Sequence, residues 1–374
     1  MQDIYKRRRD ELASWMAKQG IAAVLFRDSE LFRDPAIRYF TGHPSDAIYM
    51  QAVDTSCVLC PWDEAMAKQT ACADSIIAFG TFDRNIFKAA KGLLKRLRIP
   101  KNTKVEIPSV TSYPNFLRFV HELPDYNIIC REDGAAEFMQ QMRAVKDEYE
   151  IDCIKTASAV TDSLIDSIEK QVQEGIIKTE SDVALLIEKE CRIAGCEGTG
   201  FETLAAGPSR SFGIHCFPPY TVAEWPAPGL SILDFGVVYK GYTSDVTITV
   251  AQGNLDAEQE LQLKTVQDAY DAALPLFKSG LSVQAAAAKV DAIFAKQNRT
   301  MPHSLGHGYG LEAHEWPIIR ANIDKSIVFK PGMVVTLEPG LYDVNIGGCR
   351  LENDILICEN GSEVLTHARI IRIP

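Results

Sequence analysis

The chain has 374 residues, and its 39 basic and 50 acidic residues leave a formal net charge of −11. Apolar residues make up 46% and charged residues 24%, an ordinary globular composition that excludes disorder, collagen and coiled coil as the main architecture. The acidic balance argues against a nucleic-acid partner, and no apolar run approaches the roughly 18 residues of a membrane-spanning helix.

Strand-like and helix-like segments alternate along the first 130 residues, which predicts an α/β domain with a mixed or mainly parallel sheet. The expected helices cover 3–19, 88–98 and 115–123, and the expected strands cover 21–26, 57–61, 104–108 and 126–130. Cys57 and Cys60 form a CxxC pair in one of these strands, and without a second pair at zinc-like spacing we interpret them as buried thiols. The remaining cysteines are scattered, and the basic N-terminus has no apolar stretch behind it, so we expect a reduced, cytoplasmic protein.

Longer helical segments and hairpin-like strands replace this alternation from about residue 142, so we place a domain boundary near residue 140. Residues 1–140 then form the α/β domain, and residues 141–374 form an α+β domain. In the second domain the expected helices cover 142–172, 179–195, 256–278 and 282–296, and the expected strands and hairpins cover 201–207, 230–250, 333–342 and 348–358.

Two aspartates lie in the segment 230–250, where two alternating apolar runs meet at Lys240-Gly241 and predict a hairpin with a two-residue loop. In that register Asp234 lies opposite Thr247. Asp234 and Asp245 then become diagonal neighbours on one face, about 7–8 Å apart at the backbone, while the other face is apolar. The two carboxylates are thus within reach of one cation or of two adjacent cations. Solvated charges at a sheet edge are the alternative interpretation.

Three of the seven histidines, His303, His307 and His314, fall within the segment HSLGHGYGLEAHE, which is rich in glycine. Glycine lets a backbone pass close to a neighbour, and histidine is the commonest metal ligand. This grouping indicates a site, against the alternative of surface histidines in a loop. His215 is a fourth candidate, although a lone histidine is more often an ordinary half-buried residue.

Two glutamates occupy or follow apolar strands, where an unpaired carboxylate is unfavourable. Glu338 shares a strand face with Thr336, and Glu352 shares one with Arg350 and Asp354. A salt bridge would explain either glutamate alone. Together with the two aspartates and one histidine, the glutamates form an oxygen-rich set that suits two adjacent divalent ions bridged by carboxylates.

The blocks DFG…SDVT, HSLGHGYGLEAHE, EPGLY and RLEND, in this order, resemble the pita-bread metallopeptidases, the superfamily of aminopeptidase P, prolidase, methionine aminopeptidase and creatinase. The resemblance covers about residues 140–374 and implies the pita-bread fold there. The first 140 residues, which include IRYFTG, resemble the creatinase-type N-terminal domain more weakly. Methionine aminopeptidases generally lack that domain, which disfavours them here.

The resemblance implies five metal ligands. Asp234 matches the aspartate that holds one ion, and Asp245 and Glu352 match the bridging carboxylates. His307 and Glu338 match the ligands of the other ion, and Glu338 also matches the residue that shuttles the proton.

Further roles follow from the same resemblance. His215 and His314 match histidines that contact the substrate and the tetrahedral intermediate, and His303 matches a histidine at the substrate pocket. Tyr342 and Arg350 match residues behind the first aspartate that steer the ligands. One departure is Ile248, which stands where related proline peptidases often have arginine; the hairpin register places it on the apolar face.

The implied reaction is hydrolysis of the amide bond of N-terminal Xaa-Pro in dipeptides or short peptides. Two divalent ions are the implied cofactor, with manganese expected and cobalt, zinc or iron as alternatives. The resemblance also implies a homodimer, and the chain length favours the shorter, prolidase-like forms. Three alternatives stay open: a metallopeptidase of this fold without proline specificity, a creatinase-like C–N hydrolase, and a non-catalytic binding module.

Overall fold

The structure is a computed structural model that describes residues 2–374 and separates into two units, one that ends at Met142 and one that spans Arg143–Pro374. The strands of the first unit are β1 Ile21–Asp28, β2 Ala47–Ala52, β3 Cys57–Pro61, β4 Ser75–Ile76, β5 Lys104–Glu106 and β6 Asn127–Ile129. They form one sheet in the order β4-β3-β2-β1-β5-β6. Because β1 runs antiparallel to β2 and parallel to β5, the sheet is mixed.

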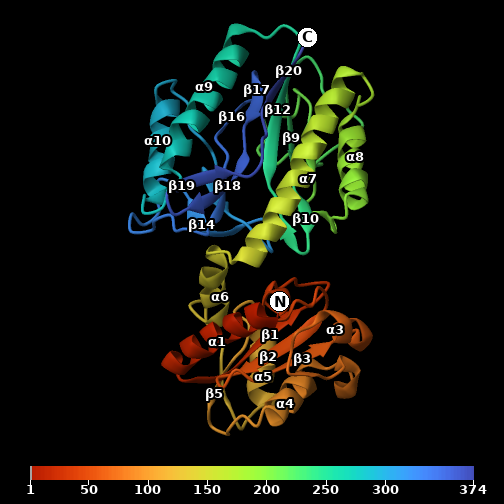
Figure 1. Ribbon diagram of the computed structural model, residues 1–374, viewed down its shortest axis with the longest axis vertical. Coiled ribbons are helices and arrows are strands. Elements are labelled where there is room, and N and C mark those ends of the chain that lie inside the picture. The colour runs from red at the N-terminus through yellow and green to blue at the C-terminus, as the bar shows by residue number, and fades with distance from the viewer. Residues whose placement is uncertain (1) are drawn as a thin grey trace. The chain divides into compact units, whose positions relative to one another are not determined.

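Helices cover both faces of this sheet (Figure 1). They are α1 Gln2–Gln19, α2 Ala36–Thr41, α3 Glu64–Thr70, α4 Ile86–Arg96, α5 Tyr113–Glu122 and α6 Ala135–Ala144, the last of which extends across the division between the units. Leu93 of α4 and Phe119 of α5 pack with Leu25 of β1 in one apolar core. The opposite face of β1 presents Phe26, whose ring contacts that of Phe40 in α2. The strand residues therefore alternate between two apolar layers.

The second unit contains short strands in several connected sheets. The strands are β7 Gly198–Thr199, β8 Leu204–Ala206, β9 Gly229–Phe235, β10 Val237–Tyr239, β11 Tyr242–Thr243, β12 Val246–Gln252, β13 Gly306–Gly308, β14 Glu315–Ile319, β15 Val334–Leu337, β16 Gly340–Asp343, β17 Gly347–Arg350, β18 Asn353–Cys358, β19 Gly361–Val364 and β20 Ile370–Ile373. The two larger sheets have the orders β20-β12-β9-β8 and β14-β13-β15-β18-β19.

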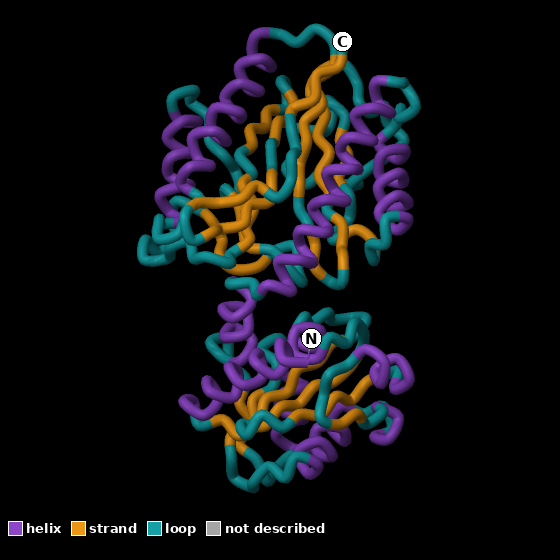
Figure 2. The backbone as a smooth tube through the Cα atoms, viewed as in Figure 1, coloured by secondary structure: helices purple, strands orange, loops and turns teal. Residues whose placement is uncertain are grey.

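Four helices flank these strands, namely α7 Glu148–Gln173, α8 Glu180–Ile193, α9 Ala257–Ala273 and α10 Val283–Ala295. Figure 2 shows the strands of this unit lying between two helix pairs, with α7 and α8 on one side and α9 and α10 on the other. A single large core joins both pairs to the strands, because Ile165, Ile187, Val266 and Val290 all belong to it together with Leu233. The opposite faces of β9 and β12 are left free to carry polar side chains.

The prediction of a single helix over 142–172 is wrong at its N-terminal end. The structure has α6 and α7 instead, separated at residues 145–147. Asp147 caps α7 by accepting the Glu150 N–H, while the Glu150 carboxylate accepts the Asp147 N–H, and this capping box starts a new helix. The sequence also missed β2, which is buried along its whole length and so lacks the alternation that marks a half-buried strand.

Candidate metal centre

The predicted hairpin register is confirmed. Tyr239 pairs with Tyr242 across the loop, and Asp234 pairs with Thr247 where β9 and β12 run antiparallel. Lys240 and Gly241 both have positive φ, of 48° and 87°, as a tight two-residue hairpin loop requires. Asp234 and Asp245 therefore lie on the face opposite the buried core.

Thr247 and Glu352 connect this hairpin to the second large sheet. The Glu352 N–H donates to the Thr247 carbonyl at 3.1 Å, and the Thr247 hydroxyl donates to the Glu352 carboxylate at 2.7 Å. Asp354, two residues further on, accepts the backbone N–H of Asp245 at 3.2 Å. The sequence analysis places Asp354 on the same strand face as Glu352 but gives it no role. The spacing of two residues between Glu352 and Asp354 is the signal that could have assigned Asp354 to the site.

His307 sits in β13, between β14 and β15, so the glycine-rich segment forms a strand here. Cβ atoms at Gly306 and Gly308 would overlap backbone carbonyls of Thr336 and Trp316, so only glycine allows the three strands to approach this closely. The His307 backbone N–H donates to the Thr336 hydroxyl at 3.2 Å. These contacts fix the backbone segment that carries the His307 imidazole.

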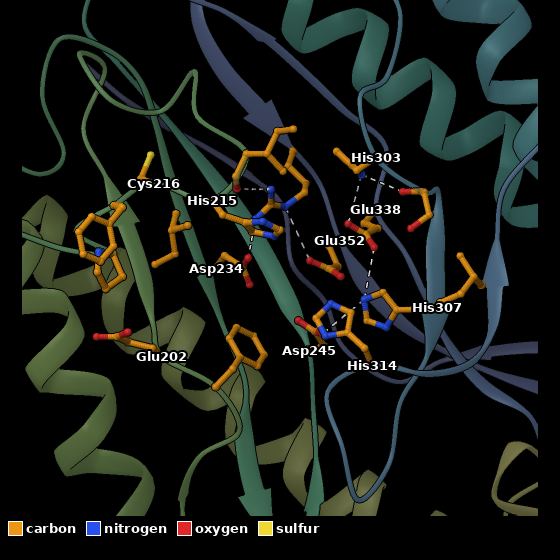
Figure 3. A pocket seen from close by; sticks show the side chains of 18 residues that line it. Glu202, His215, Cys216, Asp234, Asp245, His303, His307, His314, Glu338 and Glu352 are labelled. Carbon is orange, nitrogen blue, oxygen red and sulfur yellow. Dashed lines mark hydrogen bonds and ion pairs between the residues drawn. The ribbon is translucent and has the colours of Figure 1, made fainter. Parts of the chain in front are cut away.

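The five side chains expected to hold metal converge on one cavity of about 420 Å³ (Figure 3). Ligand atoms of Asp245, His307 and Glu352 all lie within 4.8 Å of one another, and these three residues are buried. His307 Nε2 lies 3.8 Å from a carboxylate oxygen of Asp245 and 3.4 Å from one of Glu338. Asp234 lines the same cavity.

The electrostatics of this cluster call for a cation. Burial and the neighbouring carboxylates raise the pKa of Asp245 and Glu338 well above the ordinary range, and burial with Asp234 raises the pKa of Glu352 to about 7. Burial also raises the pKa of Asp234, although Arg350 opposes the shift. Oδ1 of Asp234 is buried without a hydrogen-bond partner. An oxygen-rich set with one imidazole and an unsatisfied carboxylate oxygen fits divalent metal ions.

A series of hydrogen bonds links the Asp234 carboxylate to Arg350, then to Tyr342, and then to His303. Arg350 donates to the Asp234 carboxylate and to the Tyr342 hydroxyl, the latter at 2.8 Å. The Tyr342 hydroxyl lies 3.0 Å from His303 Nε2, and His303 Nδ1 lies 2.7 Å from the Ser304 carbonyl. Arg350 also donates to the Thr247 hydroxyl. This series of hydrogen bonds fixes the orientation of Asp234.

His215 and His314 also line the cavity, each supplied by a segment outside the named strands. The His314 ring lies 4.3 Å from the His307 ring. Both imidazoles are therefore beside the carboxylate cluster, as Figure 3 shows, and they are available to a molecule bound there.

Ile248 is fully buried in the core of the second unit, so its side chain points away from the carboxylates, as the register predicted. Cys57 and Cys60 are buried free thiols in β3. Within residues 2–374 no helix has the length and apolar character needed to cross a membrane.

Comparisons with known proteins agree with this geometry. A family model described as metallopeptidase family M24 matches residues 152–359. An Xaa-Pro dipeptidase of Pyrococcus horikoshii is 30% identical over 369 residues, which cover 97% of this chain and 98% of that protein. The structure of an X-Pro aminopeptidase from Thermotoga maritima matches with a TM-score of 0.83 and 26% identity, covering 98% of this chain and 99% of that one. A prolidase from Pyrococcus furiosus matches with a TM-score of 0.79 and 26% identity over 95% of this chain and 99% of that chain. The expected fold, an α/β N-terminal part followed by a pita-bread part, is confirmed.

Proposed function

Because the chain belongs to metallopeptidase family M24 and is a metallo-exopeptidase, we propose that it hydrolyses the amide bond of N-terminal Xaa-Pro in short peptides with the help of two divalent ions. The observation that carries the proposal is the convergence of four carboxylates and one imidazole, from five separate points of the chain, on one cavity. Creatinase-like and non-catalytic relatives lose ligands of this kind, whereas every position is filled here.

We assign the metal ligands by position. Asp234 would hold one ion, His307 and Glu338 would hold the other, and Asp245 and Glu352 would contribute to both. Divalent ions held by this set would supply Lewis acidity toward the substrate carbonyl and toward water. Manganese is the proposed metal, with cobalt, zinc and iron as alternatives.

The chain's own residues handle the proton and the substrate. Glu338 accepts a proton from water and delivers it to the leaving nitrogen, a role open to a carboxylate that lines the cavity beside the other proposed ligands. His215 and His314 donate hydrogen bonds to the substrate carbonyl as negative charge develops on its oxygen. His303, at the wall of the same cavity, contacts the substrate, while Tyr342 and Arg350 keep Asp234 in place.

The proposed proline specificity rests on the names of the relatives, an Xaa-Pro dipeptidase and an X-Pro aminopeptidase among them. A prolyl nitrogen carries no hydrogen, so this substrate does not need the strand-like N–H contact that other peptide clefts provide. We further propose a cytoplasmic homodimer, an arrangement that gel filtration with light scattering would test.

The deciding experiment strips the purified full-length protein with EDTA and restores manganese, cobalt, zinc or iron(II). Substrates are Ala-Pro, Ala-Pro-Ala, Ala-Ala-Ala and creatine. We expect turnover of the prolyl peptides only, and only with metal. Equal rates on Ala-Ala-Ala would favour a non-proline peptidase, and turnover of creatine alone would contradict the proposal.

A further inference from the structure

A second cavity of about 490 Å³ adjoins the catalytic one, and the two share His303, Ser304 and Ile318 as a common wall. The second cavity is also lined by Arg320 and Asp291. Arg320 is exposed and forms no ion pair within residues 2–374. A cavity that holds a cationic side chain without an ion-pair partner thus lies against one wall of the catalytic cavity.

The catalytic cavity itself offers no free cation to a substrate carboxylate. Among its described lining residues the one permanently charged cation is Arg350, whose side chain is 3% exposed. Its guanidinium already donates to Thr247, Tyr342, Asp234 and the Ile214 carbonyl. Both ring nitrogens of His303 are also engaged. Beside the leaving nitrogen, a substrate carboxylate would therefore lose hydration without a free cationic side chain of the cavity as its partner.

The two neighbouring cavities contain exposed side chains of opposite charge at their far ends. Figure 3 shows Glu202 and His303 on opposite sides of the carboxylate cluster. Glu202 is exposed at its end of the catalytic cavity, while Arg320 lies in the chamber beyond His303. An unblocked peptide carries an ammonium at one end and a carboxylate at the other. Charge complementarity directs its amino end toward Glu202 and its carboxyl end toward Arg320.

We propose that the substrates are peptides of three or more residues, whose chain beyond the leaving proline crosses Ser304 and Ile318 into the second cavity, where Arg320 pairs with a terminal carboxylate. This inference rests on the proposed function and narrows it, because a dipeptide ends inside the catalytic cavity. It departs from the expectation of a prolidase-like form that chain length had favoured.

The test uses the manganese-loaded full-length protein and four substrates: Ala-Pro, Ala-Pro-NH2, Ala-Pro-Ala and Ala-Pro-Ala-NH2. We expect kcat/KM for Ala-Pro to be at least about tenfold below that for Ala-Pro-NH2 and for Ala-Pro-Ala, the size of penalty that an unpaired desolvated carboxylate brings. Ala-Pro cleaved as fast as the other three would overturn the inference while leaving Xaa-Pro hydrolysis intact. No metal-dependent turnover of any of the four would instead overturn the proposed function.

Arg320→Gln tests the cation directly. We expect KM for Ala-Pro-Ala to rise up to about fivefold, the size of an exposed charge pair, with kcat little changed. Ala-Pro-Ala-NH2 lacks the carboxylate and should show no such rise. The matched control is Lys325→Gln, which removes an exposed cation from the same connecting segment but lines neither cavity. Equal losses on the acid and the amide, or equal losses in the two variants, would contradict the role of Arg320.

Discussion

A buried ion cluster supports the loop that carries His314. The Glu315 carboxylate accepts hydrogen bonds from Arg143, from Lys146 at 3.2 Å and from the Glu312 N–H at 3.1 Å. The side chains of Arg143, Lys146 and Glu315 are 2%, 1% and 4% exposed. Gly310 leaves room for the carboxylate, since a Cβ there would lie 2.9 Å from Glu315 Oε1. The loop from Gly310 to Glu315 is therefore folded around one charged group.

Glu315→Gln keeps the shape of this side chain and removes its charge, which leaves buried Arg143 with Glu312 as its ion-pair partner and buried Lys146 with none among the described residues. Removal of one partner from a buried ion pair costs about 3–5 kcal/mol. For a unit of the size of residues 143–374, each kcal/mol lowers Tm by about 2–4 °C, so we expect a fall of roughly 6–20 °C. Because His314 adjoins this loop, kcat on Ala-Pro-Ala should fall more than KM rises.

Differential scanning calorimetry at one scan rate measures the effect, and Glu312→Gln is the matched control. Glu312 pairs with the same Arg143 at 2.8 Å, but its side chain is 45% exposed, so its loss should cost at most about 1 kcal/mol. Similar Tm values for the two variants, or a fall below about 2 °C in Glu315→Gln, would refute the reasoning.

The cluster also has a pH signature. Burial alone would raise the pKa of Glu315, but Arg143 and Lys146 outweigh it and hold that pKa below its ordinary value of 4.5. A carboxylate with a lowered folded-state pKa contributes its stability above the unfolded-state pKa and loses it as the pH falls through the folded-state pKa. The Tm difference between the wild type and Glu315→Gln should therefore be full at pH 7 and narrow below pH 4.5.

Further predictions concern the metal centre. Asp245→Ala and His307→Ala should each lose bound metal, measured by plasma mass spectrometry, and lower kcat at least about 100-fold with an unchanged circular dichroism spectrum; full metal and activity in either would contradict the ligand assignment. Tyr342→Phe removes the hydroxyl that contacts both the His303 imidazole and the Arg350 guanidinium, and we expect about a tenfold loss in kcat or in metal affinity. Unchanged kcat and metal affinity would argue against a role of Tyr342 in orienting Asp234. Gly306→Ala forces a Cβ against the Thr336 carbonyl, so we expect it to lower the free energy of unfolding by about 1–3 kcal/mol and to weaken metal binding. Gly80→Ala, which meets no atom within 4 Å, should be close to neutral.

The hairpin that carries Asp234 and Asp245 was predictable because its determinants are local. Strict alternation assigns each side chain to a face, and the loop at Lys240-Gly241 sets the register, so the pairing of Asp234 with Thr247 follows from sequence spacing. The same alternation placed Ile248 in the core. The motif resemblance pointed to the family by the same kind of local pattern.

Other features depend on contacts between distant segments. Glu315 meets Arg143 from 172 residues away, and Asp354 meets Asp245 from 109 residues away. A buried strand such as β2 has no alternation to reveal it, and the break before α7 depends on an Asp147–Glu150 capping box that an unbroken helical period conceals. Local spacing carries no information on such pairings.

By itself, the sequence determined which residues are chemically suited to hold metal and which face of its strand each one occupies, because side-chain type and backbone period are properties of the chain. The tertiary structure decided how near those residues come to one another and what adjoins them. The wall of His303, Ser304 and Ile318 that the two cavities share, the hydrogen bonds of Arg350 and the second cavity at Arg320 arise only when segments far apart in sequence pack together. Burial and electrostatic environment are properties of the assembled fold.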